Sequence, residues 1–218
     1  MSRAQSRGLT PRFALVKNIV YAFILYRVLE SSIRSVGNLV ENSTQGVCYA
    51  TLFILVVTSI IHWSISTEEL PYLNNIYGYA RFALDLVVAF MYIGLISIAE
   101  GVSNASGASQ FVFWTAMVFI AYFAWDLVRA FEYHAAYKQR SFTRALFLRS
   151  LVNAGFAFAF YAISWILGKV AEGAMLSESY VPALMIFTPV LILVYRYAKN
   201  KKIKRPSQPS RSPQLKIP

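Results

Sequence analysis

Two aspartates occupy the same position in two copies of an apolar segment. Residues 80–92 read ARFALDLVVAFMY and residues 121–133 read AYFAWDLVRAFEY, so nine of the thirteen positions are identical. Asp85 belongs to the first copy and Asp126 to the second. A carboxylate is costly in apolar surroundings. Each aspartate is therefore expected either to pair with a cation or to serve an ion, a proton or a polar solute.

The other charges of the repeat fall where they could neutralise these carboxylates. If both copies are helices that run in opposite directions, Arg81 lies opposite Glu132, and Asp85 lies within one residue of Arg129. Pairs within one helix are also open, because Arg81 precedes Asp85 by four positions and Asp126 precedes Arg129 by three. We predict that the two helices pack side by side with Asp85 near Arg129. Arg81 is expected near Glu132 or Asp85.

Each copy also places a stripe of residues on one helical face around its aspartate. The stripes contain Phe82, Asp85, Ala89 and Tyr92 in the first copy, and Phe123, Asp126, Ala130 and Tyr133 in the second. Small residues let membrane helices approach closely. The two stripes are therefore expected to face each other or a shared cavity.

Asp126 has no unique partner on the other copy once Asp85 takes Arg129, so it is the first candidate for a functional carboxylate. An earlier segment offers further polar groups at helical spacing: Arg27, Glu30, Ser31, Arg34 and Asn38. Such a stripe is expected to face the bundle interior or a watery cavity, where Arg27 could reach Asp126. The alternative is an amphipathic helix that lies at the membrane surface.

Apolar spans long enough to cross a membrane must position these charges. The chain has 218 residues, 57% hydrophobic and 14% charged, whereas soluble domains carry about a quarter charged residues. Spans are predicted at residues 18–37, 46–66, 79–101, 110–133, 148–170 and 180–198. The predicted fold is an all-α integral membrane protein, a bundle of about six transmembrane helices with a local inverted repeat in helices 3 and 4. Five spans and one interfacial helix are the alternative.

The basic residues orient this bundle. Most of the 21 lysines and arginines fall on one side of a six-span arrangement, and positive charge favours the cytoplasmic side. Both termini and the predicted loop 134–147 are therefore expected in the cytoplasm, most simply at the cell membrane. The chain divides into a basic N-terminus, 1–17, a helical bundle, 18–198, and a basic tail rich in proline and serine, 199–218.

The expected partners follow from this distribution of charge. The tail, 199–218, is expected to be disordered and could bind anionic lipids, while the spans contact the lipid bilayer. Because the basic residues flank apolar spans, nucleic acid is not an expected partner. A homo-oligomer or another membrane protein is a possible partner. The sequons at Asn42 and Asn104 fall in predicted outer loops.

Motifs for catalysis and cofactors are lacking in the sequence. It contains no glycine-rich phosphate loop, no H-E-x-x-H and no plausible Ser/His/Asp set, so an enzyme is not expected. The single cysteine, Cys48, allows neither an intrachain disulfide nor a cysteine metal cluster. No cofactor is expected.

Two classes of function remain open. The first is a small channel or transporter for a cation, a proton or a small polar solute, with the intramembrane charges as its polar elements. The alternative is a non-catalytic membrane subunit or scaffold whose charges only pair helices. A polar cavity that reaches Asp126 would favour transport, and fully paired charges without water would favour the scaffold.

Overall fold

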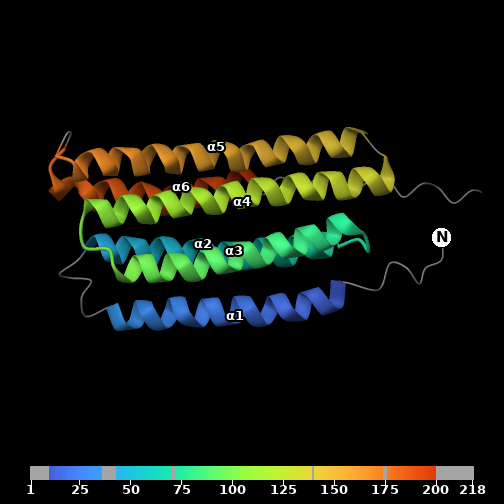
Figure 1. The fold of residues 1–218 in the computed structure, drawn as a ribbon, viewed down its shortest axis with the longest axis horizontal. Helices are drawn as coiled ribbons and strands as arrows, with labels where there is room; N and C mark the ends of the chain where they lie inside the picture. Colours follow the sequence, from blue (N-terminus) through green and yellow to red (C-terminus); the bar gives the residue numbers. More distant parts are fainter. Residues whose placement is uncertain (1–9, 36–42, 70–71, 139, 174–175, 200–218) are drawn as a thin grey trace, which may run out of the picture.

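The computed structural model describes residues 10–35, 43–69, 72–138, 140–173 and 176–199, and this part of the chain is helical without strands. Its α-helices are α1 (Thr10–Ser35), α2 (Ser43–Glu69), α3 (Ile76–Glu100), α4 (Ala105–Tyr137), α5 (Arg140–Ala171) and α6 (Val181–Lys199). A 3-10 turn, Glu178–Tyr180, precedes α6. Figure 1 shows that consecutive helices run in opposite directions.

The helices form one elongated bundle. α1 packs against α2 and α3 along one edge, while α4 and α5 form the most extensive pair and α6 packs against α2 and α5 (Figure 1). At one end of the bundle α1, α3 and α5 begin and α2, α4 and α6 end. This end contains most of the buried charged residues of the described structure and is called the polar end. Thr10 and Lys199, the outermost described residues, both lie there.

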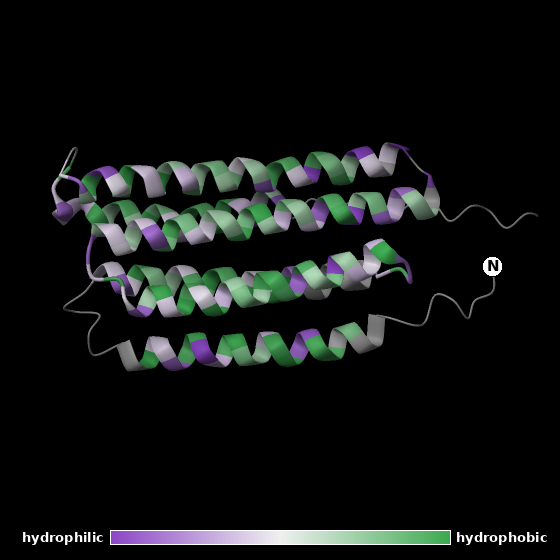
Figure 2. Cartoon of the chain, viewed as in Figure 1, coloured by the Kyte–Doolittle hydropathy of each residue, from purple (hydrophilic) through white to green (hydrophobic). Residues whose placement is uncertain are grey.

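Five of the helices are long and apolar enough to cross a membrane. They contain the stretches Ser43–His62, Ile76–Glu100, Ala105–Ala136, Thr143–Ala171 and Glu178–Lys199. Hydrophobic residues predominate along the helices in Figure 2. This pattern fits a multi-pass integral membrane protein with its helices in contact with the lipid bilayer. An inverted repeat within α3 and α4 stays a prediction.

α1 turns an apolar face outward and a more polar face inward. Its buried face contains Lys17, Tyr21, Ile24, Val28 and Ser31, whereas its exposed hydrophobic residues are Leu15, Val16, Ile19, Phe23, Tyr26, Leu29 and Ile33. An amphipathic helix that lies at the membrane surface exposes its polar face to water and buries its apolar face in the bilayer. α1 has the opposite distribution, but it is not among the five helices of the described structure that are apolar enough to cross a membrane.

The prediction that Arg27 and Glu30 point into the bundle is wrong. Their side chains pair with each other at 2.8 Å and are 41% and 21% exposed, on the flank of α1. Ser31 is the buried member of the predicted stripe, and it donates a hydrogen bond to Glu100 at 2.8 Å. The side chain of Arg34 and residue Asn38 lie outside the described part of the structure.

The predicted loop 134–147 is mostly helical. α4 continues to Tyr137, where Lys138 takes a left-handed conformation with φ of 53°, and α5 begins at Arg140. Hydropathy locates the part of a helix that lies in hydrocarbon, whereas a helix can continue into the headgroup layer, and α4 and α5 extend beyond the predicted spans. Asn104, the residue of one predicted sequon, caps α4 by accepting a hydrogen bond from Gly107 N at 2.9 Å.

Away from the polar end, the core of the bundle is apolar. Fully buried residues there include Leu52, Leu95, Phe111, Val112, Phe160 and Leu167. Few polar groups interrupt this region: Thr51 and Thr188 share a hydrogen bond of 2.9 Å, and Ser109 donates one of 2.8 Å to the carbonyl of Ser164. This half of the bundle is held by close packing.

A close backbone approach brings the α2–α3 connection against the polar end. Asn75 caps α3 by accepting a hydrogen bond from Gly78 N at 2.9 Å. A Cβ at Gly78 would overlap the carbonyl oxygen of Leu73 and lie 3.1 Å from a carboxylate oxygen of Glu132. Only glycine leaves room for the connection, which turns the Tyr72 side chain into the bundle.

Replacing Gly78 with alanine should therefore destabilise the protein by about 1–3 kcal/mol, the usual cost of overpacking. The matched control is Gly94→Ala in the same helix, because nothing lies within 4 Å of a Cβ there. Alanine favours a helix by roughly 0.5–1 kcal/mol over glycine, so Gly94→Ala should be neutral or stabilising. Thermal unfolding of both variants in detergent measures the difference. Equal stability of the two would contradict the close approach at Gly78.

Candidate functional site: the charged cluster at the polar end

Seven charged residues are buried together at the polar end, each at most 6% exposed. They are Lys17 on α1, Arg81 and Asp85 on α3, Asp126, Arg129 and Glu132 on α4, and Lys199 on α6. A buried charge is tolerated when a partner neutralises it and its remaining polar atoms are hydrogen-bonded. The pairing of these seven groups therefore determines what the cluster can do.

The first ion pair joins α1 to α3. Lys17 Nζ lies 2.5 Å from a carboxylate oxygen of Asp85. The other oxygen of Asp85 accepts a hydrogen bond from the hydroxyl of Tyr72, which itself lies 3.3 Å from Lys17 Nζ. Asp85 is thus held by one cation and one hydroxyl from two different parts of the chain.

The second ion pair joins α3 to α4. Arg81 Nη1 donates to Glu132 at 2.5 Å, and the backbone N–H of Leu73 donates to the other carboxylate oxygen at 2.6 Å. The Arg81 guanidinium also lies over the ring of Tyr72, 4.0 Å from its centroid, and 5.4 Å from that of Trp125. The predicted proximity of Arg81 to Glu132 is confirmed.

The third ion pair joins α4 to α6, and a side chain of α5 is hydrogen-bonded to it. Lys199 Nζ lies 2.8 Å from Asp126, and the amide nitrogen of Asn153 donates to the same carboxylate at 2.8 Å. Lys199 also donates to the side-chain amide oxygen of Asn153 at 2.7 Å and to the Tyr195 hydroxyl at 2.8 Å. The Tyr195 hydroxyl donates to Asn153 at 2.8 Å, which closes the network.

The predicted partner of Asp85 is wrong, because Asp85 pairs with Lys17 and not with Arg129. Arg129 Nη1 lies 3.7 Å from Asp126 on its own helix. Arg27 pairs with Glu30, so it does not serve Asp126 as the sequence suggested. The prediction compared only two helices, whereas the lysines arrive from α1 and α6 on long, flexible side chains.

The two aspartates of the repeat have similar surroundings. Each pairs with a lysine from α1 or α6, and each network includes a tyrosine hydroxyl. The stripe residues Asp85, Ala89, Tyr92, Asp126, Ala130 and Tyr133 are buried, while Phe82 and Phe123 are partly exposed. Phe82 stacks on Phe13 of α1 with ring centroids 4.1 Å apart. Phe82 therefore contacts α1 and does not serve the α3–α4 interface alone.

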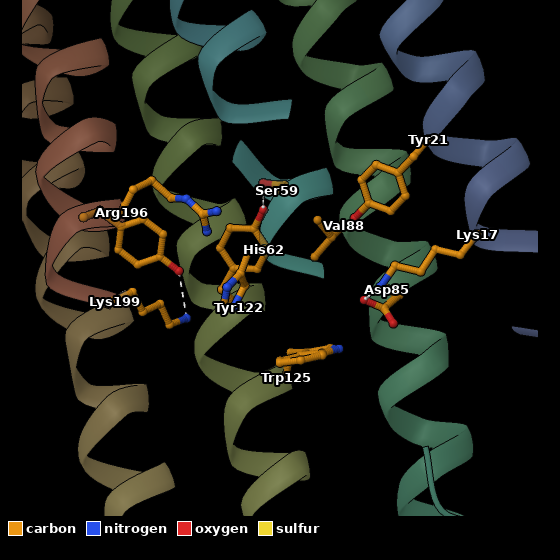
Figure 3. Close-up of a pocket in the computed structure, with 11 residues that line it drawn as sticks. Lys17, Tyr21, Ser59, His62, Asp85, Val88, Tyr122, Trp125, Arg196 and Lys199 are labelled. Atoms are coloured by element: carbon orange, nitrogen blue, oxygen red, sulfur yellow. Dashed lines mark hydrogen bonds and ion pairs between the residues drawn. The ribbon is translucent and has the colours of Figure 1, made fainter. Parts of the chain in front are cut away.

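A small cavity lies between the Lys17–Asp85 pair and the lysine of the Lys199–Asp126 pair (Figure 3). Its lining consists of Lys17, Tyr21, Ser59, His62, Asp85, Val88, Tyr122, Trp125, Tyr195, Arg196 and Lys199. The hydroxyls of Ser59, Tyr92 and Tyr122 are hydrogen-bonded to one another beside it. About 30 Å³ is open to the centre of a water molecule, which is room for roughly two waters.

The cavity wall carries more positive than negative charge. Lys17, Arg196 and Lys199 face it, against one carboxylate, that of Asp85. Positive potential in a region of low dielectric repels cations strongly. Among the described residues no group of three or more His, Cys, Asp or Glu side chains could hold a metal ion.

Sequence reasoning missed the lysines, Asn153 and Tyr72 of this site. Lys17 and Lys199 were assigned to the basic N-terminus and tail because they lie at the edges of apolar spans. Their spacing could have revealed them, since Lys17 precedes Tyr21 by four residues and Lys199 follows Tyr195 by four. That spacing places each lysine on the tyrosine face of its helix.

Removing one partner of the Arg81–Glu132 pair should leave the other as a buried charge without a counter-ion. We expect Arg81→Met to destabilise the protein by about 3–5 kcal/mol, and Arg81→Met with Glu132→Gln to restore much of that loss, because glutamine still accepts from Leu73 N. The control is Arg27→Met, which breaks a half-exposed pair and should cost less than about 1 kcal/mol. Thermal unfolding in detergent measures all three. A double variant less stable than Arg81→Met would contradict the idea that Glu132 without Arg81 is a costly buried charge.

Comparison with known proteins adds no assignment to this geometry: no protein-family model, no curated protein and no solved structure matches the chain.

Proposed function

We propose that this chain is a non-catalytic multi-pass membrane protein, a subunit or scaffold, in which the buried charges clamp the helices at the polar end. The observation that carries this proposal is the set of three buried ion pairs, each between different helices: α1 with α3, α3 with α4, and α4 with α6. Asn153 adds α5 to this set, and Tyr72 and Leu73 add the connection that follows α2.

The size and position of the cavity favour the clamp over a solute pathway. Room for about two waters lies at the polar end, and the other half of the core is closely packed and apolar. The carboxylates of Asp85, Asp126 and Glu132 each have a cationic partner within 2.8 Å. A carboxylate that binds a transported ion would have to release that partner first.

Transport of a small polar solute or a proton is the second candidate. It is favoured by one observation, that the cavity lies between two lysine–aspartate pairs and is lined by hydroxyls of Tyr21, Ser59 and Tyr122. A cation is the least suitable solute, because the cavity wall is positively charged.

The placement of the protein is part of the proposal. We place α1 across the membrane as a sixth span, on account of its outward apolar face, and both termini in the cytoplasm of a cell membrane. The lipid-facing surfaces leave room for a homo-oligomer or another membrane protein. The proposed binding of anionic lipids by the basic tail, 199–218, concerns residues that, apart from Lys199, lie outside the described structure.

Flux in proteoliposomes separates the two candidates. The clamp predicts no flux of protons or small solutes above that of empty liposomes, and an Asp126→Asn form that differs from the parent in stability only. The variant should lower the unfolding temperature, because Lys199 loses its charged partner. Parent-dependent flux that Asp126→Asn abolishes, at equal protein incorporation, would instead establish transport.

Labelling of single cysteines tests the orientation. Lys138→Cys in the exposed α4–α5 turn should react with a membrane-impermeant maleimide only after the cells are permeabilised. The control is Ser103→Cys, exposed in the α3–α4 connection at the opposite end, which should react in intact cells. Native Cys48 is buried and should contribute little. Labelling of position 138 in intact cells would reverse the orientation.

A further inference from the structure

A groove runs along one outer face of the α4–α5 pair, whose helices lie side by side in Figure 1. It consists of two hollows, one of about 310 Å³ at the polar end and a deeper one of about 270 Å³. Lining residues of the two hollows follow one another as Ile120, Phe123 and Leu127 on α4, and as Phe147, Ala154 and Phe158 on α5. These positions differ by three, four or seven, so both hollows open on the same face of each helix.

The groove is mostly apolar and faces away from the bundle. Its lining residues Ile120, Phe147 and Phe158 are among the exposed large hydrophobic residues of the structure. From His134 to Ala116 the groove follows α4 for about 27 Å, at 1.5 Å per residue. Half of a hydrocarbon core is about 15 Å thick. The groove is therefore long enough for a whole acyl chain of one leaflet.

Basic side chains surround the groove where it reaches the polar end. Arg140 and Arg144 lie one turn apart on α5, and His134 Nδ1 of α4 lies 3.2 Å from the hydroxyl of Thr143. All four residues line the same hollow. The apolar stretch of α4 ends at Ala136 and that of α5 begins at Thr143, so these side chains lie at the level of the lipid headgroups.

The two arginines lack counter-ions on the helices that form the groove. α5 contains no Asp or Glu, and the carboxylates of α4, Asp126 and Glu132, are buried and paired with cations of other helices. Within the described part of the chain, the exposed guanidinium groups of Arg140 and Arg144 make no hydrogen bond or ion pair. A guanidinium binds phosphate through parallel hydrogen bonds, and basic pockets between membrane helices bind anionic headgroups.

We propose that the α4–α5 groove binds an anionic phospholipid, with its phosphate at Arg140 and Arg144 and one acyl chain along the apolar part. A zwitterionic lipid is less suitable, because the lining of the groove has no carboxylate for the ammonium of its headgroup. The proposal goes beyond the helix clamp, since the groove is lined by none of the seven buried charged residues. It also differs from lipid binding by the basic tail, 199–218.

The test is thermal unfolding of the full-length protein in detergent micelles that contain phosphatidylglycerol or phosphatidylcholine with the same acyl chains. A lipid that binds only the folded state raises the unfolding temperature saturably, by roughly 5–10 °C at a hundred times its Kd. Phosphatidylglycerol should produce this rise at a lower lipid content than phosphatidylcholine. Glycerol phosphate, which has no acyl chains, should produce none.

Three variants assign the response to the groove. Arg144→Gln should reduce the preference for phosphatidylglycerol, and Arg140→Gln with Arg144→Gln should abolish it. Ala154→Phe should fill the deeper hollow and weaken the response to both lipids. The control is Lys138→Gln, which removes one exposed positive charge from the adjacent turn, outside the groove, and should respond like the parent. The rise is compared within each variant, so a less stable variant remains informative.

Equal responses of the parent to the two lipids would overturn the recognition of an anionic headgroup. A preference for phosphatidylglycerol that persists in the double arginine variant would overturn the assigned site and move the binding to other basic residues, such as those of the tail. An equal rise with glycerol phosphate would overturn the lipid as the occupant, as would a dimer that Ala154→Phe dissociates. None of these results would bear on the clamp, which the Arg81 and Glu132 variants test separately.

Discussion

The cost of placing charge in an apolar bundle is the constraint on which the arrangement of this protein depends. Asp85, Asp126 and Glu132 are buried, and each is within 2.8 Å of a cation from another helix. An unpaired charge at the centre of a membrane helix costs about 2.5–3.5 kcal/mol on insertion scales. Because the partners lie on different helices, neutralising the carboxylates also fixes which helices are neighbours and how they are aligned.

This constraint explains the division of the bundle into two halves. At the polar end, charge pairs and hydrogen bonds set a specific geometry, whereas the remainder of the core is held by packing of residues such as Phe111, Phe160 and Leu167. Apolar packing alone tolerates shifts between helices better than a set of directional ion pairs does. The ion pairs at the polar end are therefore expected to fix how the helices are aligned along one another. The apolar half is expected to hold the helices in close contact.

Much of the helical fold could be predicted from the sequence, because the length of an apolar stretch indicates whether its helix can cross a membrane. Aligning the two copies of the repeat as antiparallel helices also predicted the Arg81–Glu132 pair correctly. The partner of Asp85 could not be found that way, since pairing depends on which helix lies beside it, and Lys17 belongs to a helix whose position the pattern leaves open. The cavity could not be predicted either, because its lining comes from five helices, α1, α2, α3, α4 and α6.

The order of synthesis gives the Lys199–Asp126 pair a consequence for biogenesis. Lys17 is synthesised before Asp85, so the partner of Asp85 is present when α3 enters the membrane. Asn153 and Lys199 are synthesised after Asp126, so Asp126 has neither partner until α5 and α6 are made. Until then, Arg129 at 3.7 Å is the neighbouring cation on the same helix. A partly synthesised chain therefore exposes an incompletely neutralised carboxylate, which quality-control machinery in the membrane could recognise as a sign that the last helix has not yet docked.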